Sequence, residues 1–339
     1  MRCWAIGPSS GLWMLATAAR AADPAVAACV HESDPDLRIA ACTSVIRSGQ
    51  YIGVAGAWSF NDRGNAYDAR RDYDRAVADY DTAIRLNPAY PSALNNRGNV
   101  FLDMGEYDHA IADYDSAIRL DPSDADTVNN RGVAYARRGD YDRAIADYDT
   151  AIRLRPDNPA ALNNRGNAQH DKGDYDRAIA DFDAALRLAP GWPAALNGRG
   201  IAFDRKGDYD RAVADFDAAL RADPDDAAAL HNRCWAEIQR HRAAPALDDC
   251  SRAARLQPHD ANLLDSLGFA QLRAGAAARA LAEFDHALEL DPRLATSLLG
   301  RATAERRLGD QAGADRDVTA AQAIQPDVEA DLRGQAILP

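Results

Sequence analysis

The sequence contains very little lysine, no cluster of basic residues and no long apolar run. Lys172 and Lys206 are its only lysines, and arginine carries the rest of the positive charge. The net charge of the 339-residue chain is −13 at pH 7. An acidic chain without a basic cluster repels nucleic-acid phosphates and anionic lipid headgroups, so we expect no nucleic-acid partner. The lack of a long apolar run predicts that there is no transmembrane segment.

Motifs of catalysis and metal binding are also missing. The sequence has no GxSxG, no Gly-rich phosphate loop, no HExxH and no EF-hand spacing. Its seven histidines lie at unrelated positions. Most aspartates lie four residues from an arginine along a predicted helix, as Asp147 does from Arg143. We expect such residues to form solvent-exposed pairs, so no acid–base pair stands out. We therefore predict no enzymatic activity, no metal site and no cofactor.

Four of the five cysteines form two local pairs. Cys29 and Cys42 lie 13 residues apart, and Cys234 and Cys250 lie 16 apart. Both separations suit residues that face each other across a two-helix hairpin, and neither has zinc-ligand spacing. We predict two disulfides and hence an oxidising compartment. The alternative is four buried thiols in a cytosolic protein.

The first residues resemble a secretory signal peptide. Arg2 is followed by the apolar residues 12–16, and Ala19-Arg20-Ala21 fits a cleavage site of small residues. We predict that residues 1–21 are a signal peptide and that the protein is periplasmic or secreted. One alternative is a disordered N-terminus on a cytosolic protein. Another is a lipoprotein, because Val26-Ala27-Ala28-Cys29 loosely resembles a lipid-attachment box.

The rest of the chain repeats with a fixed period. Prolines recur every 34 residues, at Pro88, Pro122, Pro156, Pro190, Pro224, Pro258, Pro292 and Pro326. They define eight copies, 57–90, 91–124, 125–158, 159–192, 193–226, 227–260, 261–294 and 295–328. Residues 22–56 resemble a degenerate copy that carries the first cysteine pair. Residues 329–339 are expected to form a C-terminal cap and tail.

Each copy has the pattern of two helices joined by a tight turn. In 125–158, apolar residues between Tyr141 and Ile152 recur at helical spacing. Gly139-Asp140 separates this helix from a shorter one before it, because Gly can end a helix and Asp can cap the next. Pro156 ends the second helix. Such a hairpin cannot bury its apolar faces alone, so the copies must stack.

The copies resemble the tetratricopeptide repeat family. Counting from the first residue of each copy, the family has a large apolar residue at position 4, Gly at 8, an aromatic at 11, Ala at 20, an aromatic at 24, Ala at 27 and Pro at 32. In the second copy these residues are Leu94, Gly98, Phe101, Ala110, Tyr114, Ala117 and Pro122. The resemblance covers residues 57–328. It implies an all-α fold, a right-handed α-solenoid of eight helix–turn–helix repeats after a disulfide-linked N-terminal degenerate repeat.

Two departures from the family pattern are informative. Position 7, usually apolar in the family, is arginine in every copy except the seventh, which has Leu267. A buried arginine needs a partner, and the aspartate at position 23 is the expected one. The sixth copy has Cys234 in place of the Gly and Cys250 in place of the aromatic. We expect the second disulfide to replace the packing that is lost there.

Asparagines recur in the middle of the first helices, where asparagine is a poor helix former. In the family, the first helices line the concave groove, and by that resemblance these amides form a ladder along it. Such a ladder could hold an extended peptide by its backbone, or it could only link neighbouring repeats. Aromatic residues at proposed groove positions are further candidates. The candidate groove residues are Asn65, Asn95, Asn96, Asn99, Asn129, Asn130, Asn163, Asn164, Asn167, Trp192 and Trp235.

From these features we expect a non-enzymatic scaffold of the cell envelope that holds an extended polypeptide or a partner protein in its concave groove. Recognition of an envelope glycan or peptidoglycan by the aromatic residues is one alternative. A role as accessory subunit of a separate enzyme is another. The sequence leaves the partner's identity and the oligomeric state open.

Overall fold

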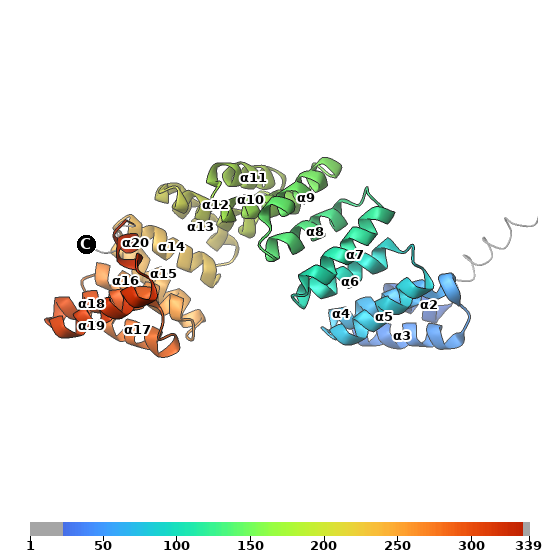
Figure 1. The fold of residues 1–339 in the computed structure, drawn as a ribbon, viewed down its shortest axis with the longest axis horizontal. Coiled ribbons are helices and arrows are strands. Elements are labelled where there is room, and N and C mark those ends of the chain that lie inside the picture. Colours follow the sequence, from blue (N-terminus) through green and yellow to red (C-terminus); the bar gives the residue numbers. More distant parts are fainter. Residues whose placement is uncertain (1–22, 335–339) are drawn as a thin grey trace, which may run out of the picture. The chain divides into compact units, whose positions relative to one another are not determined.

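A computed structural model describes residues 23–334, which form helices arranged in successive pairs (Figure 1). No strand occurs in the described residues. The all-α solenoid fold predicted from the sequence is confirmed. The chain divides into two compact units, Met1–Pro156 and Asp157–Pro339, and each is described by itself. The predicted signal peptide, residues 1–21, lies outside the described residues.

The first unit contains the predicted degenerate hairpin and three full pairs of helices. Its helices are α2 (Pro24–His31), α3 (Pro35–Ser48), α4 (Ala57–Ala69), α5 (Tyr73–Leu86), α6 (Pro91–Asp103), α7 (Tyr107–Leu120), α8 (Ala125–Arg137) and α9 (Tyr141–Leu154), with a short 3₁₀ helix, η1 (Gly53–Gly56), before α4.

The second unit contains five further pairs and a terminal helix. These are α10 (Pro159–Asp171), α11 (Tyr175–Leu188), α12 (Pro193–Arg205), α13 (Tyr209–Ala222), α14 (Ala227–Gln239), α15 (Ala243–Leu256), α16 (Ala261–Arg273), α17 (Ala277–Leu290), α18 (Ala295–Leu308), α19 (Gln311–Ile324) and α20 (Val328–Gly334).

The turn within the third copy follows from local chemistry. Gly139 has a φ of +85°, a conformation that glycine adopts without strain, and it closes α8. The carboxylate of Asp140 then accepts a hydrogen bond of 3.2 Å from the backbone N–H of Arg143 and caps α9. Helix α9 ends at Leu154, two residues before Pro156. The sequence pattern therefore predicted both ends of this helix correctly.

Glycine at position 8 allows the two helices of a pair to approach closely. A Cβ added at Gly132 would lie 2.7 Å from Cε1 of Tyr148, the fully packed aromatic at position 24. The last copy carries Ala302 at position 8 and Val318 at position 24. The larger side chain at position 8 is therefore accompanied by a smaller one at position 24. The contact between these positions thus sets the distance between the paired helices.

In the sixth copy a disulfide occupies this same contact. Cys234 on α14 and Cys250 on α15 are bonded, with their Cα atoms 5.5 Å apart, and both side chains are buried. Cys29 on α2 and Cys42 on α3 form the second disulfide, with Cα atoms 4.6 Å apart. Both predicted cysteine pairings are confirmed. Each bond links the two helices of one pair, so it holds a hairpin together rather than joining distant parts of the chain.

Candidate functional site

The asparagines of the first unit form a hydrogen-bonded ladder between neighbouring first helices. Asn96 on α6 donates from Nδ2 to Oδ1 of Asn61 at 3.1 Å and to Oδ1 of Asn65 at 2.9 Å, both on α4. One repeat further on, Asn130 on α8 donates from Nδ2 to Oδ1 of Asn95 at 3.2 Å and to Oδ1 of Asn99 at 3.1 Å. The amides therefore do link repeats, which was one of the two roles left open by the sequence.

Tyrosines from the second helices complete this ladder. Tyr80 Oη donates to Asn65 Oδ1, and Tyr114 Oη donates to Asn99 Oδ1, both at 2.7 Å. Burial raises the pKa of both phenols well above the usual range, so they remain protonated donors. Each of these two asparagine oxygens therefore accepts two hydrogen bonds, one from a tyrosine and one from the next asparagine.

The internal bonds leave a complementary donor and acceptor on α6. Asn96 uses its Nδ2 hydrogens and keeps Oδ1, whereas Asn99 uses Oδ1 and keeps Nδ2. The two residues are three positions apart on a helix, so their side chains lie on the same face. Both side chains are half-buried rather than enclosed. The Oδ1 of Asn96 can accept from a peptide N–H, and the Nδ2 of Asn99 can donate to a peptide C=O, so the two side chains together match the polar groups of a peptide backbone.

The candidate asparagines of the second unit are less uniform. On α10, Asn163 is buried with an Oδ1 that accepts no hydrogen bond, Asn164 is half-buried and Asn167 is exposed. The ladder resumes where Asn232 on α14 donates from Nδ2 to Oδ1 of Asn197 on α12 at 2.9 Å. Asn129, on α8 of the first unit, is half-buried. The predicted residues therefore fall into two groups, one in each unit.

Trp235 lines a cavity of about 330 Å³ between α12 and α14. Ile201, Asp204 and Arg205 line it from α12, and His231 and Asn232 line it from α14. In repeat numbering these residues occupy positions 5, 6, 9, 12 and 13, which the family resemblance assigns to the groove. Trp192, the other candidate tryptophan, is half-buried at the N-cap of α12 and does not line this cavity.

The histidine of this cavity is held neutral. Trp235 Nε1 donates to Nε2 of His231 at 2.9 Å, and Ser266 Oγ lies 2.7 Å from the same nitrogen. An indole N–H can only donate, so His231 Nε2 is the acceptor and carries no proton. Burial also lowers the pKa of the His231 imidazole. The wall that contains Trp235 therefore carries no positive charge from this histidine.

The carboxylate of Asp204 also lines this cavity, and one of its oxygens receives no hydrogen bond. Its Oδ1 atom is buried and has no partner. Burial raises the pKa of this carboxyl to about 6, with a small opposing effect of Arg205. Sequence reasoning missed both Asp204 and His231, since aspartates are abundant and the histidines follow no repeat position. An acidic residue at groove position 12 was the signal that could have identified Asp204.

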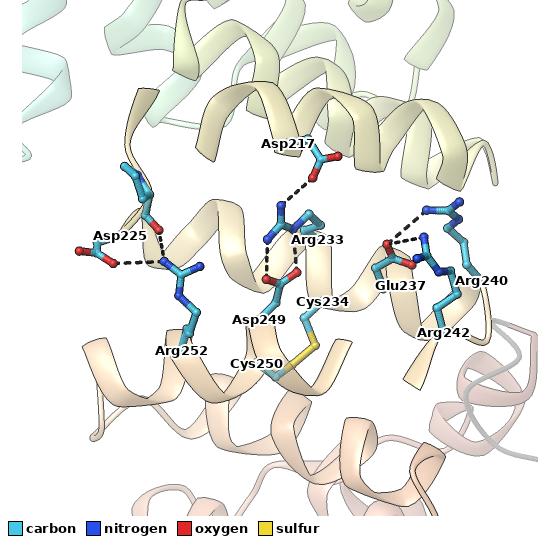
Figure 2. A network of polar contacts seen from close by, with 11 residues as sticks. Asp217, Asp225, Arg233, Cys234, Glu237, Arg240, Arg242, Asp249, Cys250 and Arg252 are labelled. Carbon is cyan, nitrogen blue, oxygen red and sulfur yellow. Dashed lines mark hydrogen bonds and ion pairs between the residues drawn. A yellow bond between two sulfur atoms is a disulfide. The ribbon is translucent and has the colours of Figure 1, made fainter. Parts of the chain in front are cut away.

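The arginines at position 7 serve the scaffold. Figure 2 shows Arg233 between two carboxylates, with Nε and Nη2 donating to Asp249 at 2.7 and 2.6 Å and Nη1 donating to Asp217 of the preceding copy at 2.6 Å. Arg97, Arg131, Arg199 and Arg301 make the same three contacts in their own copies. The predicted partner at position 23 is confirmed, and the second partner at position 25 was not foreseen.

The sixth copy also contains a second polar cluster beside its disulfide (Figure 2). Glu237 is buried and accepts from Arg240 at 3.2 Å and Arg242 at 3.3 Å. Burial raises the pKa of the Glu237 carboxyl, and the two arginines oppose this shift. The cluster replaces the Gly-Asp turn that this copy has lost, with His241 at a φ of +57°. It therefore has a structural role at the turn.

Neither a metal cluster nor a membrane-spanning helix is found in the part of the chain that the structure describes. No group of three or more His, Cys, Asp or Glu residues among residues 23–334 is placed to hold a metal ion. Within the same residues, no helix combines the length and the apolar character needed to cross a membrane.

Comparison with known proteins identifies the type of repeat. Residues 61–125 and 129–193 match a family model described as tetratricopeptide repeat, and residues 193–226 match a second model with the same description. A search of curated proteins finds no match to this sequence.

Three solved structures resemble the fold. A tetratricopeptide repeat protein from Parabacteroides merdae ATCC 43184 has a TM-score of 0.58 at 22% identity, and the match covers 73% of this chain and 98% of that one. A chain of the APC/C hetero-tetramer Cut9–Hcn1 has a TM-score of 0.63 at 18% identity, covering 81% of this chain and 53% of that one. PilF of Pseudomonas aeruginosa has a TM-score of 0.54 at 20% identity, covering 60% and 92%. At these identities the likeness concerns the fold alone.

Proposed function

The chain is a tetratricopeptide repeat protein, and from this premise we propose that it is a non-enzymatic scaffold that holds an extended polypeptide against the first helices of its repeats. The fold in general supports interaction with proteins or peptides. The observation that carries the proposal for this chain is the pair Asn96 and Asn99 on α6. Their internal bonds orient them and leave one acceptor and one donor for a peptide group.

Recognition of this kind would be independent of peptide sequence. A side-chain amide that bonds the backbone of a ligand does not contact its side chains. The tyrosine and asparagine bonds hold the amides in place before a ligand arrives, so little conformational entropy is lost on binding. The pair is incomplete on the neighbouring helices, where Asn65 on α4 keeps only its Nδ2 donor and Asn130 on α8 keeps only its Oδ1 acceptor. Each of these two groups would add one further weak contact to a bound peptide.

Replacing Asn99 with aspartate tests the proposal. Asn99→Asp keeps the Oδ1 atom that accepts from Tyr114 and Asn130, but it exchanges the Nδ2 donor for an oxygen. We expect a blocked nonapeptide library of random sequence to bind this variant about tenfold more weakly. The carboxylate oxygen cannot donate to a peptide C=O, and its negative charge repels the carbonyl oxygen. Fluorescence polarisation of the labelled library measures the change, and it should affect all library members alike.

Asn87→Asp is the matched control. Asn87 is the C-cap of α5, and its Oδ1 accepts from the backbone N–H of Ala89. Asp121 has the same role at the same position of the next copy, where it accepts from the backbone N–H of Ser123. This variant adds the same charge to the same unit and should bind as the wild type does. Equal binding by Asn99→Asp and the wild type would exclude the amide site. Failure of the wild-type protein to bind any library member would refute the scaffold proposal itself.

We further propose that the protein is exported to the periplasm or secreted. Two buried disulfides are typical of an oxidising compartment, and they support this location. The bond to Cys42 also occupies the sulfur of Cys29, which leaves no thiol there for a lipid. These bonds favour soluble export over the lipoprotein alternative.

Mass spectrometry of the protein isolated from cells checks the export proposal. The expected mature chain begins at Ala22 and is four hydrogens lighter than its reduced form, one for each bonded cysteine. Treatment with a thiol-alkylating reagent should add no mass until a reductant is present. An intact Met1, free thiols at Cys234 and Cys250, or a lipid on Cys29 would each contradict the proposal.

A further inference from the structure

The cavity between α12 and α14 contains an ionisable group that the scaffold does not satisfy. The Oδ1 atom of Asp204 is buried and receives no hydrogen bond, whereas Asp181, Asp215 and Asp249, at position 23 of its own copy and the two neighbouring copies, are each paired with an arginine. A buried carboxylate without a donor is costly, so such a group points to a donor that arrives from outside. The cavity of about 330 Å³ gives that donor room.

The charges around the cavity favour a cationic donor. His231 is neutral because its Nε2 accepts from Trp235, and Asp204, which is half-buried with an enclosed Oδ1 atom, is the acidic residue among those that line the cavity. Arg205 lies at the exposed rim and does not bond Oδ1 of Asp204. The net charge of the whole chain, −13, also attracts a basic ligand and repels an acidic one.

Aromatic and amide groups complete a site for a long basic side chain. Trp235 offers apolar surface for methylene groups, and its aromatic face attracts a nearby cation. Asn232 and Gln239 add polar atoms at the wall formed by α14. Trp235 is held in place by its bond to His231 and by Phe269, whose ring centroid lies 5.8 Å from its own.

We propose that this cavity is a specificity pocket that binds a lysine or arginine side chain of the polypeptide held by the scaffold, with Asp204 as the counter-ion. The proposal rests on the proposed function, because the side chain must belong to a bound peptide. It adds what the asparagine ladder lacks. The ladder would hold any extended backbone, whereas this pocket would select for a basic residue and set its register.

Blocked nonapeptides that differ only at their central residue test the pocket. One set carries lysine, one carries norleucine, which has a similar length without the charge, and one carries glutamate. We expect wild-type protein to bind the lysine set about tenfold more tightly than the norleucine set, and the glutamate set most weakly. This comparison needs no variant, so it does not depend on the folding of a mutant.

The variant Asp204→Asn then tests whether Asp204 causes the preference for lysine over norleucine. The amide has the same shape, and no internal hydrogen bond is lost, so the variant should remain folded in a urea titration. Its preference for lysine over norleucine should disappear. The matched control is Glu289→Gln, which removes the same charge from an exposed position on α17 and should keep the preference.

The outcomes separate this inference from the proposal on which it rests. If lysine and norleucine sets bind wild-type protein equally, the pocket is refuted and the scaffold function stands. If the lysine preference survives in Asp204→Asn, another group is responsible and the pocket is refuted as well. If no set binds at all, the scaffold function fails and the pocket fails with it.

Discussion

Replacing Asp147 with alanine is expected to lower the free energy of unfolding by about 3 kcal/mol, because it leaves a largely buried arginine without its main partner. Asp147 is buried and accepts from Nε and Nη2 of Arg131 at 2.8 and 2.6 Å. In the variant Arg131 keeps only the more exposed Asp115. Urea denaturation followed by far-UV circular dichroism measures the loss.

A double variant separates the effect of an unpaired charge on stability from the effect of lost packing. Leu267 in the seventh copy shows that an apolar residue is accepted at the position of Arg131. Arg131→Leu/Asp147→Leu removes both charges, and exchanging a buried ion pair for apolar residues is often close to neutral. We expect this variant to lose about 1 kcal/mol or less. A loss as large as that of Asp147→Ala would mean that packing, and not an unpaired charge, explains the single variant.

Removing the disulfide of the sixth copy is expected to cost a similar amount. Cys234 and Cys250 close a loop with a sequence separation of 16, for which restriction of the unfolded chain is worth about 3 kcal/mol. The variant Cys234→Ala/Cys250→Ala should therefore unfold at a clearly lower urea concentration under non-reducing conditions. Wild-type protein treated with a reductant should lose at least as much, because both of its disulfides open.

A variant that restores the repeat pattern serves as the comparison. Cys234→Gly/Cys250→Tyr carries the residues found at Gly132 and Tyr148, where the ring fills the space beside the glycine. It should recover part of the stability by packing while remaining less stable than the bonded protein. If the alanine variant is as stable as the wild type, the crosslink does not compensate for the lost contact, and the structural role assigned to it is wrong.

The fold was predictable because its determinants are local and repeated. Pro156, Gly139 and Asp140 act within a few residues of their own position, and the proline recurs in all eight copies. The contact of Gly132 with Tyr148 also has a constant separation of 16 residues, which Cys234 and Cys250 reproduce. The pairing of Arg131 with Asp147 followed from the rule that a buried charge needs a partner.

The candidate site was less predictable because its chemistry depends on contacts between copies. The sequence placed Asn96 and Asn99 on one helix face but could not tell which of their atoms neighbouring repeats occupy. Asp115, the second partner of Arg131, belongs to the preceding copy and was missed for the same reason. The position of Asp204 at groove position 12 was a signal in the sequence, but the absence of a partner for its Oδ1 atom depends on which side chains of neighbouring helices lie within reach.

By itself, the sequence determined the helical pairs, the resemblance to the tetratricopeptide repeat family, the two disulfides and the acidic net charge. Only the tertiary structure decided which polar atoms remain available. A hydrogen bond forms only where a partner side chain lies within reach, and for Asn99 those partners come from other helices. Tyr114 and Asn130 consume the oxygen of Asn99 and leave its amide hydrogens, whereas no side chain reaches Oδ1 of Asp204.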